Sequence, residues 1–175
     1  CVSIKESPWK NKEGDVPREL YTICHDHYAH DGEAESLGAA YVLKRTNNFS
    51  ETLNECVVAS YVGRPSTQDE YNRNLFLLAE YYNAKIGFEN DRGDVVGYAK
   101  RYNKLHWLEE KFEILEKKQR YQQRSRKTTS RPYGMSMNSQ SRKNQAEIYL
   151  KQWLLTPVAK YSDGSQKLVL HSILD

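Results

Sequence analysis

The sequence predicts a mixed α/β domain in which three antiparallel strands are followed by a helix and a parallel strand, with helices flanking the sheet. Three observations support this fold class. Short β-prone runs come first and are separated by turn residues. A segment with helical spacing follows them. One more β-prone run comes directly after that segment, and a strand reached through a helix usually pairs in parallel, by a right-handed crossover.

The early part of the chain contains three β-prone runs, at 20–26, 37–44 and 55–62. Because their connections are short, we expect consecutive runs to pair as an antiparallel meander. Residues 1–18 are polar and contain two prolines. We therefore predict an irregular lead-in over 1–18 and assign the folded domain to 19–175.

The first helix is predicted from its start signal and its spacing. Ser66 and Thr67 offer a hydroxyl cap, and acidic residues follow in the first turn. Apolar residues then continue at helical spacing, which predicts a helix that ends near Asn83. The residues at this spacing are Tyr71, Leu75, Leu78 and Tyr82. The strand after this helix is expected at 84–89.

Three further elements are expected beyond that strand. A second helix should run from about 94 to 102, and 105–108 is a candidate fifth strand. A last helix should resume at Asn144 and end before Pro157. The resulting order β-β-β-α-β-α is the skeleton of the ribonuclease H-like fold, an analogy that alone establishes no function.

Composition excludes several classes of protein. The 175 residues carry a net charge of only +3, so the overall charge does not indicate a nucleic-acid binder. Three cysteines without a C-x-x-C pair do not suggest a disulfide framework. The chain contains neither a G-x-x-x-x-G-K-[ST] nucleotide loop nor a G-x-S-x-G nucleophile elbow.

Two acids end strands of the predicted sheet. Asp26 ends the first run, and Glu89 ends the strand after the helix. If these strands are neighbours, both carboxylates can share Mg²⁺ or Mn²⁺, because these ions prefer oxygen ligands. Two such ions about 3.5–4 Å apart can activate water for phosphodiester cleavage. The alternatives are a surface acid for Asp26 and a capping acid for Glu89.

A basic stretch spans 117–143 and contains no acidic residue. One interpretation is a flexible, solvated loop, as polar tracts of low complexity usually are. The other is an arm that follows DNA phosphates beside the acids, since Lys and Arg neutralise phosphates without reading sequence. We expect DNA contacts from Lys117, Lys118, Arg120, Arg124, Arg126, Lys127 and Arg131.

Three histidines follow the H-x-H-x-x-H spacing, namely His25, His27 and His30. Zinc hydrolases of the metallo-β-lactamase type carry a similar motif, with an Asp where this chain has Ala29. The remaining ligands would have to come from His106 and His171. Because the acid is missing and histidines are scarce, we disfavour the zinc interpretation.

Several segments resemble the nuclease half of terminase large subunits from Bacteroidetes phages, including crAss-like phages. The resemblance spans nearly the whole chain, and the order of the segments is more specific than any one of them. The segments are HDHYAHDG (25–32), SLGAAYVLKR (36–45), SYVGRP (60–65), YYNAKIGFEN (81–90), RPYGMSM (131–137) and WLLTP (153–157).

The resemblance implies a ribonuclease H-like, metal-dependent DNA endonuclease. In such nucleases the first metal-binding acid ends the first strand, matching Asp26, and the second follows the fourth strand, matching Glu89. The family often has proline after the first acid, where this chain has His27. Its third acid lies on a late helix, and nothing in 144–175 matches that context. We therefore expect the chain to stop before the third ligand and to be weakly active or inactive.

The resemblance also implies partners and a location. We expect double-stranded concatemeric DNA as substrate, Mg²⁺ or Mn²⁺ as cofactor, and the host cytoplasm as location. The portal and the small terminase subunit would bind the full-length protein. The alternatives are another ribonuclease H-like enzyme, such as a junction resolvase or an RNA–DNA hybrid nuclease, and a non-catalytic nucleic-acid-binding domain.

Overall fold

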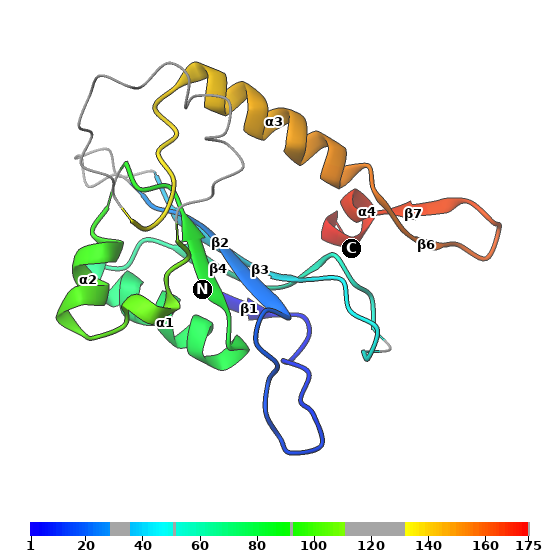
Figure 1. Cartoon of the computed structure of the whole chain (residues 1–175), viewed down its shortest axis with the longest axis horizontal. Helices are drawn as coiled ribbons and strands as arrows, with labels where there is room; N and C mark the ends of the chain where they lie inside the picture. The colour runs from blue at the N-terminus through cyan, green and yellow to red at the C-terminus, as the bar shows by residue number, and fades with distance from the viewer. Residues whose placement is uncertain (29–35, 51, 92, 111–131, 175) are drawn as a thin grey trace.

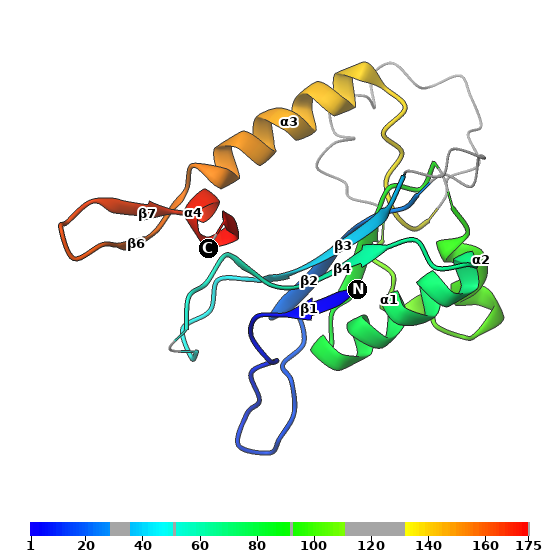
Figure 2. The same cartoon turned by 180° about the vertical axis from the view of Figure 1, so that it is seen from behind.

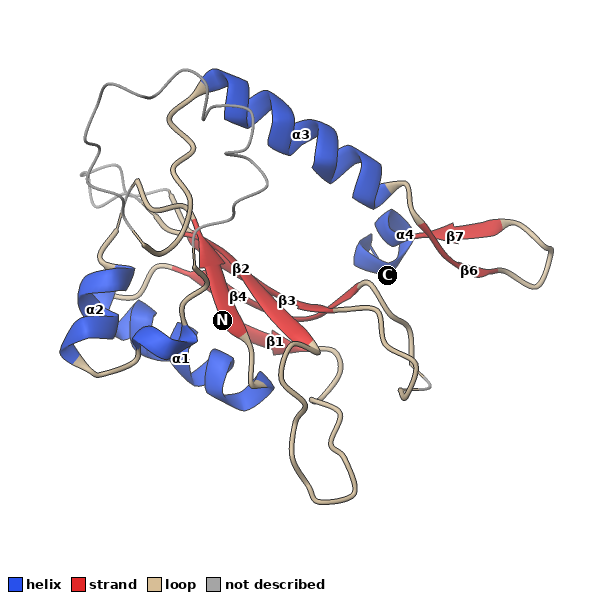
Figure 3. Cartoon of the chain, in the orientation of Figure 1, coloured by secondary structure: helices blue, strands red, loops and turns tan. Residues whose placement is uncertain are grey.

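The computed structural model describes residues 1–28, 36–50, 52–91, 93–110 and 132–174. Within these ranges the main sheet consists of β1 (Val2–Ile4), β2 (Tyr21–Asp26), β3 (Gly38–Lys44), β4 (Cys56–Gly63) and β5 (Lys85–Phe88). Their order is β1-β4-β3-β2-β5, and only β2 and β5 pair in parallel. Figure 3 shows this sheet in red. The predicted antiparallel meander and parallel strand are confirmed.

Helices lie on both sides of the sheet. Figures 1 and 2 show α1 and α2 against one face, and α3 on the other side, away from the strands. None of the helices in the described ranges is long and apolar enough to cross a membrane. The remaining elements are α1 (Gln68–Tyr82), α2 (Val95–Arg101), the 3₁₀ turn η1 (Leu105–Trp107), α3 (Gln140–Leu154), β6 (Pro157–Lys160), β7 (Gln166–Leu168) and α4 (Val169–Leu174).

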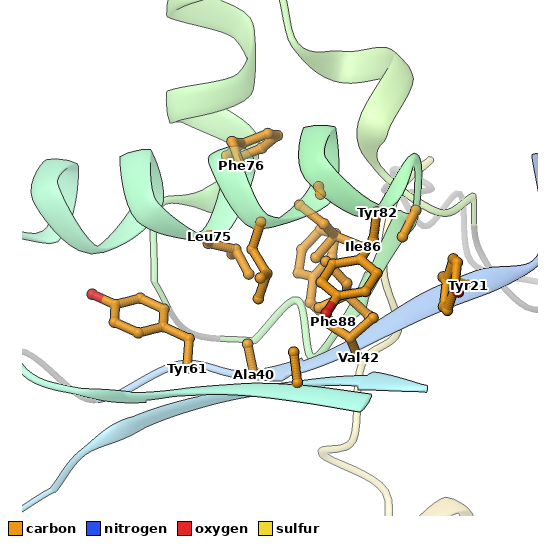
Figure 4. Close-up of a cluster of buried hydrophobic side chains, with 14 of the residues drawn as sticks. Tyr21, Ala40, Val42, Tyr61, Leu75, Phe76, Tyr82, Ile86 and Phe88 are labelled. Carbon is orange, nitrogen blue, oxygen red and sulfur yellow. The ribbon is translucent and has the colours of Figure 1, made fainter. Parts of the chain in front are cut away.

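Helix α1 begins and ends where its sequence signals lie. The Thr67 hydroxyl accepts a hydrogen bond from the Glu70 backbone N–H at 3.1 Å, and Asn83 ends the helix in the left-handed conformation, with φ of 48°. The face towards the sheet is fully apolar or aromatic apart from Asn72. Figure 4 shows Leu75 and Tyr82 of this helix above Ala40 and Val42 of β3. The core therefore lies between α1 and the sheet.

Side chains alternate between the two faces of β2, as the pleat of a strand requires. Tyr21, Ile23 and His25 are buried on the side of α1, whereas Cys24 and Asp26 are exposed. We call the side of the sheet opposite α1 the open face. This alternation places Asp26 on the open face.

The structure corrects three predicted elements. Val2–Ile4 of the predicted irregular lead-in forms an edge strand on β4, with Val2 opposite Tyr61. The candidate strand at 105–108 is instead a 3₁₀ turn, and only Leu108 bridges to Ile86 of β5. The last helix begins at Gln140 rather than Asn144, because the preceding segment is held against β5.

Candidate active site at the end of β2 and β5

Asp26 and Glu89 lie beside each other at one end of the parallel strand pair. Cys24 pairs with Gly87 and His25 pairs with Phe88, so Asp26 and Glu89 are the next residues in register. Partners in a parallel pair point to the same face. Because His25 and Phe88 point towards the core, the two acids both point to the open face.

The surroundings of Glu89 raise the pKa of its carboxyl. Burial is the largest cause, followed by the negative charges of Asp91 and Asp26 and by a hydrogen bond with the Asp91 carboxyl. The positive charge of Lys143 acts in the opposite direction. Three carboxyl groups and one lysine therefore influence one another at this end of the sheet.

Asp91 was not among the acids predicted from the sequence. Its carboxylate accepts a hydrogen bond from the Met137 backbone N–H at 2.6 Å. The segment that ends at Met137 is itself held along β5, since the Met135 N–H donates to the Phe88 carbonyl at 2.9 Å and the Asn90 N–H donates to the Met135 carbonyl at 2.8 Å. This segment leads into α3 and brings Lys143 towards the acids.

The turn that carries Asp91 packs against β2 through Gly93 and His27. Gly93 has a φ of 75°, and a Cβ at this position would lie 2.5 Å from Cγ of His27. His27 is buried, and its ring lies 5.5 Å from that of His25 and 5.6 Å from that of Tyr71. The two acid-bearing segments are thus joined by a contact on the core side of the sheet.

The histidine cluster does not form a zinc site in the described part of the chain. The Nδ1–H group of His25 donates to the Ala39 carbonyl at 3.2 Å. The Nδ1–H group of His27 donates to the Tyr28 carbonyl at 2.7 Å. Both rings are buried beside Tyr71 and face the core. His30 lies outside the described residues, and the last two histidines lie in other elements, His106 in η1 and His171 in α4.

The donor chemistry suits a hard cation, although a complete ligand set is not gathered. The pKa of the Glu89 carboxyl is raised partly by neighbouring negative charges, and a divalent cation would stabilise the ionised form of such a carboxylate. Among the described residues, no group of three or more His, Cys, Asp or Glu side chains is arranged closely enough to hold a metal ion.

The seven basic residues predicted to contact DNA, from Lys117 to Arg131, all lie outside the described residues. The residues that flank them are placed, however. Glu110 and Tyr133 form an antiparallel bridge, and the Gly134 N–H donates to the Glu109 carbonyl at 3.1 Å. The described residues on either side of these seven therefore lie beside the outer edge of β5. The flexibility expected for 117–143 stays a prediction.

Comparisons with known proteins agree on the fold. No family model matches the chain, and no curated protein matches it. Among solved structures, the large terminase nuclease from thermophilic phage G20c with bound magnesium matches with a TM-score of 0.51 and 12% identity, covering 98% of this chain and 83% of that one. A second structure of that nuclease matches with a TM-score of 0.50 and 13% identity, covering 98% of this chain and 84% of that one. The chain therefore has the ribonuclease H-like fold of the large terminase nucleases.

Proposed function

We propose that this chain is a divalent-cation-dependent DNA endonuclease domain of the terminase type, which cuts concatemeric double-stranded DNA during packaging. The observation that carries the proposal is the register of β2 and β5, which sets Asp26 and Glu89 side by side on the open face. The fold shared with a terminase nuclease supports the same function.

Mg²⁺ is the cation that we propose, with Mn²⁺ as an alternative. The related G20c nuclease is described with bound magnesium, and carboxylate oxygens suit both ions. When bound, such a cation polarises the phosphate and lowers the pKa of water. Asp26 and Glu89 would hold it, and the third acidic ligand stays unassigned among the described residues.

Positive charge near the acids would hold the DNA backbone. Lys143 lies close enough to Glu89 to lower the pKa of its carboxyl. The seven basic residues follow Glu110 and precede Tyr133 in the sequence, and these two described residues bridge to each other beside β5. Since phosphate contacts carry no sequence information, we expect cleavage with little base preference. In the full-length protein, portal and small terminase subunit would be partners, in the host cytoplasm.

A plasmid-nicking assay tests the proposal. With Mg²⁺ or Mn²⁺ present, Asp26→Ala and Glu89→Ala should each lower the nicking rate by about 100-fold or more, because each removes a carboxylate that would hold the cation, whose positive charge would stabilise the transition state. Asp163→Ala is the matched control, since Asp163 lies exposed in the turn between β6 and β7. Nicking that survives both active-site substitutions would disprove the two-acid mechanism.

The same assay separates the alternatives. Cleavage of an RNA–DNA hybrid without cleavage of duplex DNA would identify a hybrid nuclease, and cleavage confined to four-way junctions would identify a resolvase. DNA binding without nicking under any cation, by a protein that continues beyond residue 175, would favour a non-catalytic binding domain. The proposed endonuclease should cut duplex DNA of any sequence.

A further inference from the structure

The open face of the β2–β5 pair has a second polar region at its other end. Thr22 and Lys85 are register partners, as Cys24 and Gly87 are, so they share the face of Asp26 and Glu89. Lys85 and Glu89 are four residues apart, which corresponds to about 13 Å along a strand. One row of the sheet therefore runs from a lysine, past small side chains, to the acid end.

A cavity of about 670 Å³ opens around Lys85. Its walls come from segments that are distant in sequence, including Arg18 before β2, Arg45 after β3, and Trp107 in η1. The cavity is within the size range of ordinary small-ligand sites. The chain is held in place here, because the Arg45 N–H donates to the Leu20 carbonyl at 2.8 Å and the Glu109 N–H donates to the Ile86 carbonyl at 2.9 Å.

The charges of this cavity favour an anion. Arg18, Arg45 and Lys85 are exposed at its walls, and Glu19 and Glu109 are its acids. None of these five side chains forms an ion pair within 4 Å with another described residue, and the charge of Arg45 also acts on Glu55. The cations outnumber the acids, so the cavity carries a net positive charge.

An aromatic wall adds a second kind of contact. Trp107 is half-buried, with its ring against that of His106 at 5.2 Å. An indole face beside cations is the combination that proteins use for a nucleotide, because the base stacks on the ring while the phosphate meets the charges. The cavity offers both contacts in one place.

We propose that this cavity, lined by Arg18, Arg45, Lys85 and Trp107, binds a nucleotide unit, with the phosphate at the basic side chains and the base against Trp107. The unit belongs either to a DNA strand that continues along the open face or to a free nucleotide. A DNA strand fits the separation of Lys85 and Glu89, since about 13 Å spans roughly four nucleotides of one B-DNA strand. This inference goes beyond the proposed cleavage site and does not use its acids.

Binding measured in EDTA tests the cavity without cleavage. The probes are ATP and a 12-nucleotide single-stranded DNA, and the readouts are tryptophan fluorescence and a filter-binding titration. Trp107→Phe identifies the signal of Trp107, because Trp9 and Trp153 are packed elsewhere, against Phe49 and Glu55. Saturation by ATP assigns a free nucleotide as a ligand, whereas saturation by the oligonucleotide alone assigns the DNA strand.

The decisive variant is Arg45→Ala with Lys85→Ala. It should weaken binding of the saturating probe by roughly tenfold or more, since two charged contacts are lost. For the oligonucleotide, the slope of log affinity against log salt should become shallower by roughly 1.4, because each phosphate contact to a single strand contributes about 0.7. Lys160→Ala is the matched control, as Lys160 is exposed in β6, and it should leave affinity within about twofold.

Equal affinity of the double variant and the Lys160 control, for both probes, would overturn the proposal. A quench of unchanged size in Trp107→Phe would overturn the stacking contact. Because Arg45, Lys85 and Lys160 are exposed, the double variant and its control should melt at the temperature of the wild type. Failure of this test leaves the nicking experiment on Asp26 and Glu89 unaffected, and inactive acid variants should still bind the probes.

Discussion

The two faces of the sheet differ in what their side chains do. On the face under α1, Ile23 and Val42 are completely buried, and Phe76 of α1 belongs to the same core. On the open face, the same strands present exposed Asp26, exposed Tyr41 and the half-buried Glu89. Because neighbouring residues of one strand point to opposite faces, the covered face can supply stability while the open face supplies chemistry. The two roles should therefore respond to different substitutions.

The largest effect on the free energy of unfolding is expected from truncating a core side chain, with a substitution in α3 as the control. Phe76 is fully buried and stacks on Tyr98 at 5.3 Å, so Phe76→Ala should lower the free energy of unfolding by about 3–5 kcal/mol. Leu150 of α3 is 53% exposed, and Leu150→Ala should change it by less than about 0.5 kcal/mol. Urea denaturation measures both. A large loss from Leu150→Ala would show that α3 is covered in solution.

A pH titration should show the next largest effect. Burial, and then the neighbouring His27, lower the pKa of His25 from 6.5 to about 3. Below pH 6.5 the unfolded chain binds a proton here that the folded chain refuses, so stability falls as pH falls from 6.5 towards 3. This group alone should account for up to about 1.4 kcal/mol per pH unit, or roughly 2–3 kcal/mol between pH 6.5 and 4.5.

His25→Phe is the variant that isolates this contribution. It keeps an aromatic ring against Tyr71 but cannot take up a proton. The free energy of unfolding, measured by urea denaturation at several pH values, should fall less steeply in the variant than in the wild type. Identical slopes would mean that the folded chain binds a proton at His25 as readily as the unfolded chain does, which would contradict the lowered pKa.

The smallest effect should come from the contact between Gly93 and His27, which joins the core side of the sheet to the turn that carries Asp91. Gly93→Ala should push against the ring of His27, whereas Gly14→Ala meets nothing within 4 Å, and both glycines have positive φ, 75° and 89°. Backbone strain is thus common to both variants. Gly93→Ala should lower the free energy of unfolding by about 1–2 kcal/mol more than Gly14→Ala does. Thermal unfolding measures this difference.

Nicking gives the second readout of the same pair. Gly93→Ala should slow nicking, because the displaced turn carries Asp91, while Gly14→Ala should leave the rate unchanged. If the two variants behave alike in both measurements, the contact between His27 and Gly93 does not position the acids.

Local patterns were sufficient for much of the fold. The alternation in 21–26 and the cap and spacing of α1 are properties of neighbouring residues, and both were predicted correctly. The acids at 26 and 89 could also be placed in register, because a strand–helix–strand unit is right-handed and parallel. Their roles in catalysis stay predictions until the nicking assay is done.

Long-range contacts account for what the sequence did not show. β1 is a strand only because Val2 and Ile4 add to the edge of β4, and three residues carry too little periodicity to reveal it. The Asp91 carboxylate accepts a hydrogen bond from the Met137 N–H, which lies 46 residues away in the sequence, so the partner that holds this acid could not be found locally. The only local sign that the turn containing Asp91 packs closely was Gly93, because a glycine often marks a turn that other side chains approach.

The crowding of carboxyl groups around Glu89 affects which substitutions a selection for stability would favour. A raised pKa means that the folded chain holds this charge at a cost, which solvent keeps below about 1 kcal/mol at such a partly exposed position. Neutralising Glu89 would therefore make the isolated domain slightly harder to unfold. A search for heat-resistant mutants that never assays DNA would tend to accept such changes, and it would remove a carboxylate of the proposed cleavage site while stabilising the fold.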